Sequence, residues 1–567
     1  MNNPRLFLWV ALALILFVNY QTWVRDYAPV APVVQTGANG KPLSTDLDSA
    51  VPQTTGVPAA AGASPATPSA GTGTPVAAVA TAPETAAPAE AGSITVHTDV
   101  LDLNIGLRGG ELNRADILQY PKVKGEPDPV RLFRRDGADA LYVMQTGLAG
   151  DAAAGPHPTH QAVFKSSFDK FTLLDGVDEL RVPLTWMSED GVSVTKTFIF
   201  HRGAYQVDLE YTVQNGSTAP WSAAPYAQIL HDMPPVERSY LRVDTYAFEG
   251  PALYDGKKYR KLKLDNTDDA KLSQDITHGW FAALQHHFVS ALVPPADESY
   301  HYTLKVRGHE YLATAMGPSQ TIASGAQGSF KSTLFVGPKL QAALEKIHPE
   351  LSRVADYGML TILARPLFWL LQNVHGLFGN WGVTIILTTF LLKLLLYPLS
   401  EASGKSMAKM KTLGPRIKNL QETYKDDREK LGRAMMDLYK REKINPAAGC
   451  LPVVIQLPVF LAFYWVLLET VEMRQAPFVG WIQDLSARDP FFILPAIMAG
   501  AMFLQYRLQP KPADDMQAKV FMILPLVMSA TFAFFPAGLV LYYAVNTLLG
   551  IAQQWNINRR IAVESAR

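Results

Sequence analysis

The chain has 567 residues, with 51 Lys+Arg against 51 Asp+Glu, and 48% of its residues are apolar while only 18% are charged. Soluble globular proteins average roughly 25% charged residues, so this low value indicates that the chain combines unlike parts. The zero net charge excludes a protein that binds polyanions along its whole length, and the single cysteine, Cys450, excludes an intrachain disulfide framework and a cysteine-built zinc site.

The chain starts with an apolar run at residues 6–18 that follows a short basic stretch and weakens towards Val24. Such a run is either a signal peptide or a retained anchor. Residues 6–24 would reach about 28 Å as a helix, and no small-x-small cleavage site follows closely, so we favour an anchor within 1–28. Residues 29–92 are dominated by Ala, Pro, Thr, Gly and Ser, which is typical of a flexible tether.

The pattern of residues changes at Ser93. Short alternating or β-branched stretches, such as SITVHTDVLDLNI, VSVTKTFIFH and YQVDLEYTVQ, are separated by turn residues as far as Gly337. This pattern predicts one large β-sandwich over 93–337. Its acidic and basic residues are mixed, so we expect an ordinary soluble domain.

Residues 338–380 are expected to form a linking helix and then an interfacial helix. The apolar stretch at 359–379 is interrupted by Arg365, Gln372, Asn373 and His375. Polar residues at those intervals favour a helix that lies in the membrane interface rather than across it.

Five further apolar segments follow, each long enough to span a bilayer core of about 30 Å, the shortest with help from flanking residues. They cover 381–399, 450–468, 491–506, 518–535 and 537–555. Together with the amino-terminal anchor they predict six spans, five of them in a core over 381–555, and a short tail over 556–567.

Lys and Arg near the span ends predict the topology. The loop 401–449 holds twelve of them against seven acids, whereas the loop 472–490 holds two, Arg474 and Arg488. Both termini and the 401–449 loop are therefore expected in the cytoplasm, and residues 29–380 mainly on the opposite side.

Lys393 is the outstanding residue of the apolar segments, because it lies twelve positions after Trp381, about 18 Å along a helix. A charge at that depth is either functional or a lysine that snorkels to the interface. Ile386, Thr389 and Tyr397 share its helical face, which is too polar for lipid. Other segments supply Gln456, Gln505, Tyr542, Tyr543 and Asn546, which could line a wet cavity or form hydrogen bonds between helices.

The 401–449 loop predicts a helical hairpin. Two helix-period stretches are joined by Lys425-Asp426-Asp427, and Gly414-Pro415 interrupts the first. The hairpin could simply be a solvated basic face near anionic headgroups. Methionines on exposed ridges would instead suit contact with varied apolar clients; the candidates are Met407, Met410, Met435 and Met436.

The other motifs in the sequence do not indicate a catalytic or ligand-binding function. Ser403-Gly404-Lys405-Ser406 resembles the end of a phosphate-binding loop, but Leu399 stands where that pattern requires glycine. No histidine has an acidic or cysteine partner at ligand spacing, and the common hydrolase motifs are missing. We therefore expect no cofactor, metal or nucleotide.

Several longer motifs resemble the YidC family of bacterial membrane-protein insertases, in its Gram-negative form. They are Phe378-Gly379-Asn380-Trp381-Gly382, Tyr397-Pro398-Leu399, Ser406-Met407-Ala408-Lys409-Met410, Asn445-Pro446 to Gly449-Cys450, Arg474-Gln475-Ala476-Pro477-Phe478 and Phe535 to Tyr543. The resemblance is strong over 351–567 and weaker over the anchor, tether and β-domain.

The resemblance implies a polytopic α-helical membrane protein with a five-helix insertase core and a large periplasmic all-β supersandwich. The core would enclose a hydrophilic groove whose cation is commonly arginine in the family; Lys393 occupies that position here, without arginine's bidentate fork. Gln505 and Tyr543 match other groove-lining positions, and Thr389 lies one turn from Lys393.

The implied function is a non-enzymatic insertase and chaperone of the inner membrane, acting alone or with the Sec translocon. The implied partners are nascent membrane proteins, the ribosome, the translocon with its accessory subunits, and membrane lipids. The alternatives that the residues leave open are a membrane-tethered periplasmic sugar-modifying enzyme and a transporter.

Overall fold

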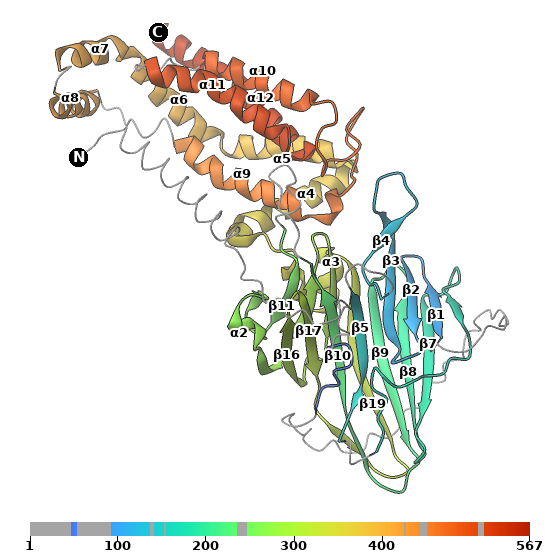
Figure 1. The fold of residues 1–567 in the computed structure, drawn as a ribbon. Helices are drawn as coiled ribbons and strands as arrows, with labels where there is room; N and C mark the ends of the chain where they lie inside the picture. Colours follow the sequence, from blue (N-terminus) through green and yellow to red (C-terminus); the bar gives the residue numbers. More distant parts are fainter. Residues whose placement is uncertain are drawn as a thin grey trace, which may run out of the picture. The chain divides into compact units, whose positions relative to one another are not determined.

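The structure is a computed structural model, and it describes residues 47–53, 92–135, 141–151, 155–234, 247–424, 427–442, 451–508 and 515–566. They form two compact units. The β-unit lies within Gly37–Asp356 and Glu469–Val471, and the helical unit within Tyr357–Leu468 and Glu472–Arg567 (Figure 1). The predicted anchor and most of the predicted tether lie outside the described residues.

The predicted β-sandwich is confirmed, with strands from Ser93 to Pro338. In β8 (Val192–His201) the residues alternate between buried and half-buried positions along most of the strand. In β9 (Gln206–Asn215) the same alternation buries Val207 and Leu209. Because side chains alternate across a strand, such a pattern covers one face with the core and leaves the other towards water.

The described strands form two sheets. The eleven-stranded sheet contains β13 (Ser273–Thr277), β16 (Ser299–Arg307), β17 (Glu310–Met316), β10 (Trp221–Asp232), β5 (Tyr142–Ala149), β3 (Glu111–Pro121), β2 (Leu101–Gly106), β1 (Ser93–His97) and β6 (Lys170–Thr172) in that order, with β18 (Gln320–Ile322) on β10 and β4 (Pro129–Arg131) on β3. The eight-stranded sheet has the order β12 (Tyr259–Lys261), β11 (Gly250–Tyr254), β14 (Trp280–Leu284), β15 (Phe288–Val293), β19 (Gln327–Pro338), β9, β8 and β7 (Glu179–Met187).

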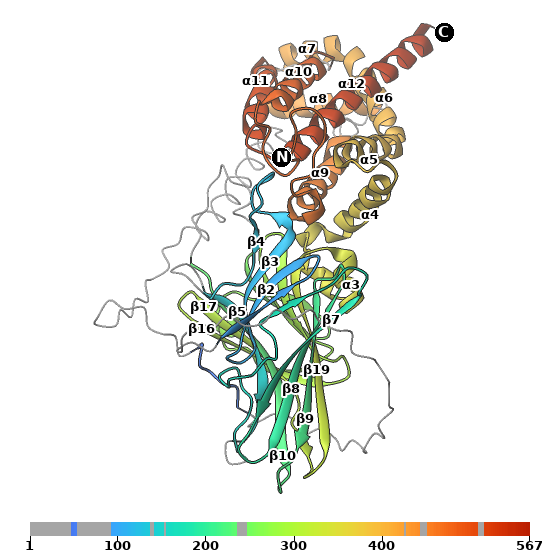
Figure 2. The ribbon, with the colours of Figure 1, turned by 90° about the vertical axis from the view of Figure 1, so that its right-hand side faces the viewer.

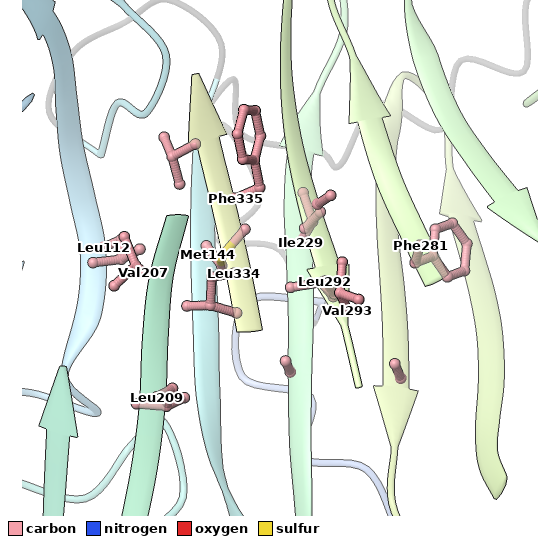
Figure 3. Close-up of a cluster of buried hydrophobic side chains, with 14 of the residues drawn as sticks. Leu112, Met144, Val207, Leu209, Ile229, Phe281, Leu292, Val293, Leu334 and Phe335 are labelled. Carbon is pink, nitrogen blue, oxygen red and sulfur yellow. The ribbon is translucent and has the colours of Figure 1, made fainter. Parts of the chain in front are cut away.

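The core of the β-unit lies between the two sheets. Leu112 and Met144 come from the eleven-stranded sheet and pack in one cluster with Val207, Leu209 and Leu334 from the eight-stranded sheet (Figure 3). Complete burial of a side chain of this size stabilises a fold by about 1.5 to 3 kcal/mol. The cluster therefore holds the two sheets together through apolar packing.

The helical unit follows the β-unit through short elements, and its helices are seen from two sides in Figures 1 and 2. The described helices after the last strand are α3 (Gln341–Ile347), η3 (Leu351–Val354), η4 (Gly358–Leu360), α4 (Thr361–Phe378), α5 (Trp381–Leu395), α6 (Tyr397–Thr412), α7 (Gly414–Thr423), α8 (Arg428–Arg441), α9 (Leu451–Glu469), η6 (Val471–Met473), α10 (Ile493–Leu508), α11 (Asp515–Phe532) and α12 (Ala537–Ala566); a short helix, α2 (Thr267–Ala270), lies in the β-unit.

Helix α4 corresponds to the predicted interfacial helix. One face buries Leu367, Phe368 and Leu371 in the core of the helical unit. Trp369 on another face is 65% exposed. Gly379 ends the helix with φ 64°, a left-handed conformation that favours glycine. An amphipathic helix with exposed aromatic surface is consistent with the predicted interfacial position, which stays a prediction.

The helix over the predicted apolar segment 381–399 is interrupted before Leu399. Helix α5 ends at Leu395, and α6 begins at Tyr397 after a bend of 58°. The bend removes Tyr397 from the regular helical spacing that would align it with Lys393. By length and hydropathy, this bent pair could cross a bilayer together, whereas no single helix among the described residues meets that test. The count of six spans stays a prediction.

Candidate functional site

Close packing with α12 positions the residues of the candidate site. A Cβ on Gly538 would lie 3.4 Å from Ile385 of α5, and one on Gly404 would lie 2.7 Å from Ile557. These contacts show α5 and α6 running alongside α12 in the same direction. Gly404 thus lies within a helix and allows close helix contact, which explains the glycine of the phosphate-loop-like motif.

Lys393, Gln505 and Gly550 meet where α5, α10 and α12 pack together. A Cβ built on Gly550 would lie 3.6 Å from Lys393 Nζ and 3.6 Å from Gln505 Nε2, and it would meet no third atom within 4 Å among the described neighbours. Two predicted site residues therefore converge beside Gly550. Sequence reasoning missed Gly550, because a lone glycine in an apolar segment carries no signal of what it faces.

Depth along the helices agrees with this convergence. Lys393 and Gln505 each lie twelve residues after the start of their helix, and Gly550 lies thirteen after the start of α12. At 1.5 Å per residue all three are about 18 to 20 Å from those starts. The ammonium of Lys393 has no hydrogen bond or ion pair within the described part of the chain.

Thr389 and Tyr543 have other partners. Thr389 is buried one turn before Lys393, and its hydroxyl donates to Ile385 O at 2.6 Å. The ring of Tyr543 packs against Phe532 at 5.0 Å and Phe460 at 5.8 Å between centroids. These contacts give both residues a packing role, and their predicted groove-lining role stays untested.

Three buried polar atoms in the helices lack a hydrogen-bond partner in the described protein: Thr388 Oγ1, Ser529 Oγ and Gln553 Nε2. Gln553 lies one helical turn after Gly550. A buried unpaired polar group costs about 1 to 3 kcal/mol. Such groups are tolerated where water or a ligand can reach them, so they extend the polar character of this region.

The loop 470–492 ties the starts of three helices together. Asn380 at the start of α5 donates to Phe478 O at 2.9 Å. Gly538 at the start of α12 donates to Leu485 O at 2.9 Å, and Asp489 accepts from Leu494 N of α10 at 2.7 Å. A network of backbone and capping hydrogen bonds therefore holds this end of the helical unit.

Within the region of the predicted hairpin, helices α7 and α8 pack against each other. Leu413 and Ile417 pack against Met435, Leu438 and Tyr439. Met435 thus faces the inside of the hairpin, whereas Met436 is 45% exposed. Met407 and Met410 lie in α6, and their side chains are outside the described part of the chain. Of the two candidates whose side chains are described, Met436 has the surface exposure that client contact requires.

Models of two families match the chain. One, described as the YidC periplasmic domain, matches residues 93–370. The other, described as the 60Kd inner membrane protein, matches residues 373–564. Together they cover both units.

Full-length relatives point to the same family as these two models. The chain is 46% identical over 573 residues to the membrane protein insertase YidC of Thioalkalivibrio sulfidiphilus (strain HL-EbGR7), with 99% of each chain covered. It is 43% identical over 578 residues to that of Nitrosococcus oceani, with 100% of each covered. A crystal structure titled as an active YidC insertase with its first transmembrane domain resolved is 20% identical, with a TM-score of 0.36, and the match covers 82% of this chain and 92% of the other.

Proposed function

Because the chain belongs to the YidC family of membrane protein insertases, we propose that Lys393 and Gln505 form the polar site through which it passes client segments into the membrane. The protein is an inner-membrane insertase with a periplasmic β-unit. The convergence of Lys393 Nζ and Gln505 Nε2 beside Gly550 carries the proposal, because it brings a cation and an amide donor together within the helical unit.

The two ends of the helical unit support a one-sided path. Hydrogen bonds of the 470–492 loop hold the starts of α5, α10 and α12. Lys393 lies about 18 Å beyond those starts, towards the end that carries the α7–α8 hairpin. A client's polar tail would thus enter from the hairpin end and stop before the tied loop.

The proposed mechanism has three steps. A hydrophobic nascent segment first contacts the hairpin, through Met436 and the methionines Met407 and Met410. Its polar or acidic flank then enters the groove, where Lys393, Gln505 and water lower its desolvation cost. The apolar part finally partitions into lipid. Burial at about 25 cal/mol per Å² makes that step favourable, so no nucleotide is required.

An unpaired ammonium suits transient binding. At an effective dielectric near 20, a lysine and a carboxylate about 4 Å apart attract by about 4 kcal/mol before desolvation is subtracted. A permanent ion pair at Lys393 would have to be broken for each client. Without one, the cation can meet each acidic tail in turn and release it.

The finer topology and partners belong to this proposal. The basic 401–449 loop supports a cytoplasmic position for the hairpin and both termini, with residues 29–380 mainly in the periplasm. The same loop is the proposed contact for the ribosome. The Sec translocon and its accessory subunits are proposed as partners for clients that need both machines. We propose that the β-unit has no catalytic role.

The test compares clients that differ only in the translocated tail, one acidic and one neutral, in an in vitro insertion assay. We expect Lys393→Arg to be nearly silent, Lys393→Ala to slow the acidic-tail client about tenfold, equivalent to about 1.4 kcal/mol in the barrier, and Lys393→Glu to be worst through like-charge repulsion. The neutral-tail client should hardly change, because its driving force is apolar partition.

Lys440→Ala provides the matched control, because this lysine lies on α8 of the hairpin and keeps the groove charge intact. Equal sensitivity of both clients to every Lys393 change would rule out the charge mechanism. So would a harmless Lys393→Ala, which is the outcome for a lysine that only snorkels.

A further inference from the structure

A row of buried polar side chains crosses the eleven-stranded sheet on the face away from the sandwich core. Gln145 Nε2 donates to Glu111 Oε2 at 2.8 Å, and Gln228 Nε2 donates to Gln145 Oε1 at 2.6 Å. Thr314 Oγ1 continues the row to Gln228 Oε1 at 3.4 Å. Their neighbours in sequence, such as Met144 and Ile229, point into the core instead. All four residues are buried, so something covers this outer face.

The cover is residues 47–53, a described stretch within the Ala/Pro/Thr-rich tether. Gln145 Nε2 donates to Asp48 Oδ1 at 2.8 Å, and Gln161 Nε2 donates to Ser49 O at 2.6 Å. Contacts of this kind use both a side chain and main-chain carbonyls of the covering segment. Residues 47–50 form a turn in which Ala50 N donates to Leu47 O at 3.2 Å, so these contacts hold a short, turn-containing segment.

Asp48 is the centre of this recognition. Both of its carboxylate oxygens accept from Arg135, at 2.8 and 3.2 Å, and Arg135 also binds Glu111. Burial alone would raise the pKa of Asp48, but the hydrogen bonds and charge of Arg135 outweigh it and lower the pKa below its ordinary value. A carboxylate held this way favours an anionic residue at this position of any bound segment.

His160 forms a hydrogen bond with the main chain beside that carboxylate. Its Nε2 lies 3.0 Å from Asp48 O and must donate, and its Nδ1 lies 2.7 Å from the hydroxyl of Tyr226. The backbone N–H of His160 donates to the same hydroxyl at 2.8 Å, so that hydroxyl is free to donate to Nδ1. Both ring nitrogens are thus satisfied in the neutral tautomer.

Apolar patches flank the polar row on both sides. Leu47 and Ala50 pack against Val143, Leu230 and Leu312. Val51 packs against a second patch, formed by Ala149, Ala224, Tyr226 and Met316. The outer face therefore offers an apolar, a polar and a second apolar strip, which match Leu47, Asp48 and Val51 in order.

We propose that this face, over β3, β5, β10 and β17, is a recognition site for a short acidic peptide, and that residues 47–53 occupy it in cis. The ligand class is a segment with one carboxylate between aliphatic residues. The polar groups belong to the sheet and to the Arg135 and His160 loops, so a segment of another chain with the same pattern would satisfy them equally and compete with the tether. This site is separate from the helical groove.

The test uses the full chain in detergent and a fluorescent peptide of residues 47–53, LDSAVPQ, with blocked ends. The variant Leu47→Asp with Val51→Asp places charges against both apolar patches and should release the native segment. We expect it to bind the peptide. Wild type should bind at least about tenfold more weakly, because its own segment competes at a high effective concentration.

Two controls probe the chemistry. A peptide with Asp48→Asn should bind about tenfold or more weakly, since it leaves Arg135 without its second carboxylate. Adding Arg135→Ala to the released chain should have a similar effect on the unaltered peptide. Equal binding of the Asp and Asn peptides, or no binding by a released chain with an unchanged unfolding transition, would overturn the proposal.

If the double variant unfolds, a second measurement decides. A photo-crosslinking amino acid in place of Ser49 in the otherwise wild-type chain should label the fragment around Gln161, and excess free peptide should reduce that labelling several-fold. Labelling that is absent, or that the Asp and Asn peptides reduce equally, would contradict the site.

Discussion

Two lysines, one in each unit, show how differently a protein can treat the same side chain, because Lys196 is fully buried and Lys393 only partly. Lys196 in β8 is 0% exposed. Its ammonium donates to Gly109 O at 2.7 Å, to Gly110 O at 2.9 Å and to Thr146 O at 3.3 Å. It also lies over the ring of Phe198 at 4.9 Å. All three ammonium protons have an acceptor, so Lys196 joins two strands and a turn as a structural element.

Lys393 in α5 is partly buried and has no such acceptors within the described residues; its ammonium lies beside Gly550 and Gln505. Burial by itself therefore does not identify a functional lysine. The partners do: a fully paired cation stabilises the fold, whereas an unpaired one remains available to a client. The comparison predicts that changes at the two lysines affect different properties.

The largest expected effect is on the stability of the β-unit. Lys196→Met keeps the length of the side chain but leaves three carbonyls without a donor in a site closed to water, so we expect a loss of about 2 to 5 kcal/mol in the free energy of unfolding. Hydrogen exchange at the amides of β8 and β9 in the full chain measures it. At permissive temperature, client insertion should be retained.

Lys331→Met is the matched control in the same sandwich. The side chain of Lys331 is 69% exposed and pairs with Glu210 at 3.2 Å, so its loss should change stability by less than about 0.5 kcal/mol. If Lys196→Met were as mild as this control, or if it abolished insertion by a still-folded chain, the contrast between the two lysines would fail.

The second prediction concerns the space in front of Lys393. Gly550→Met would place a bulky side chain beside Lys393 and Gln505, so we expect insertion of acidic-tail and neutral-tail clients to slow together, by about tenfold, or about 1.4 kcal/mol in the barrier. This differs from Lys393→Ala, which should affect the acidic tail alone. An in vitro insertion assay with both clients distinguishes the two effects.

Gly500→Met is its control, because Gly500 lies on the neighbouring helix α10 and a Cβ there would meet nothing within 4 Å. Both changes replace a helical glycine and gain similar helix propensity. Equal slowing by the two variants would mean that bulk anywhere in the helices impairs insertion, and the position of Gly550 would lose its special role.

The sequence already carried part of this contrast. In VSVTKTFIFH, the alternation that places Val194 and Phe198 in the core also places Lys196 there. The position of Lys196 among core residues therefore indicated a buried lysine, although such a residue is easy to overlook in a strand pattern. Lys393 stood out because an apolar helix surrounds it. Each charge was visible from its own strand or helix, but the acceptors of Lys196 lie about 50 to 87 positions away and no local pattern reports them.

Other features depended on packing between distant segments. Gln505 was predictable as a polar residue in an apolar segment, whereas Gly550 acquires meaning only when α5 and α10 pack on α12. The bend at Leu396 ended a segment whose hydropathy continued to Leu399. The docking of residues 47–53 was hidden in a composition typical of a tether, since seven residues rarely reveal the surface that they fit.

The smallest effect tests whether groups in the β-unit stay hidden from the solvent as Lys196 does. His231 is buried, its ring stacks on Tyr142 at 3.9 Å, and its Nδ1 lies 3.2 Å from the hydroxyl of Tyr311. Burial lowers the pKa of His231 to about 3. The folded chain therefore keeps this histidine neutral at pH values where the unfolded chain, with a pKa near 6.5, has bound a proton.

Stability should consequently be complete above about pH 7 and fall as the pH drops below 6.5 towards 3, because the unfolded state then binds more protons. Between pH 7 and pH 5.5 the loss from this one group is about 1.3 kcal/mol. Denaturant titrations monitored by hydrogen exchange in β10 measure the slope, and His231→Gln should reduce it by nearly one proton. If His231→Gln left the slope unchanged, the acid sensitivity would belong to other groups of the β-unit, and His231 would not be set apart from them by its burial.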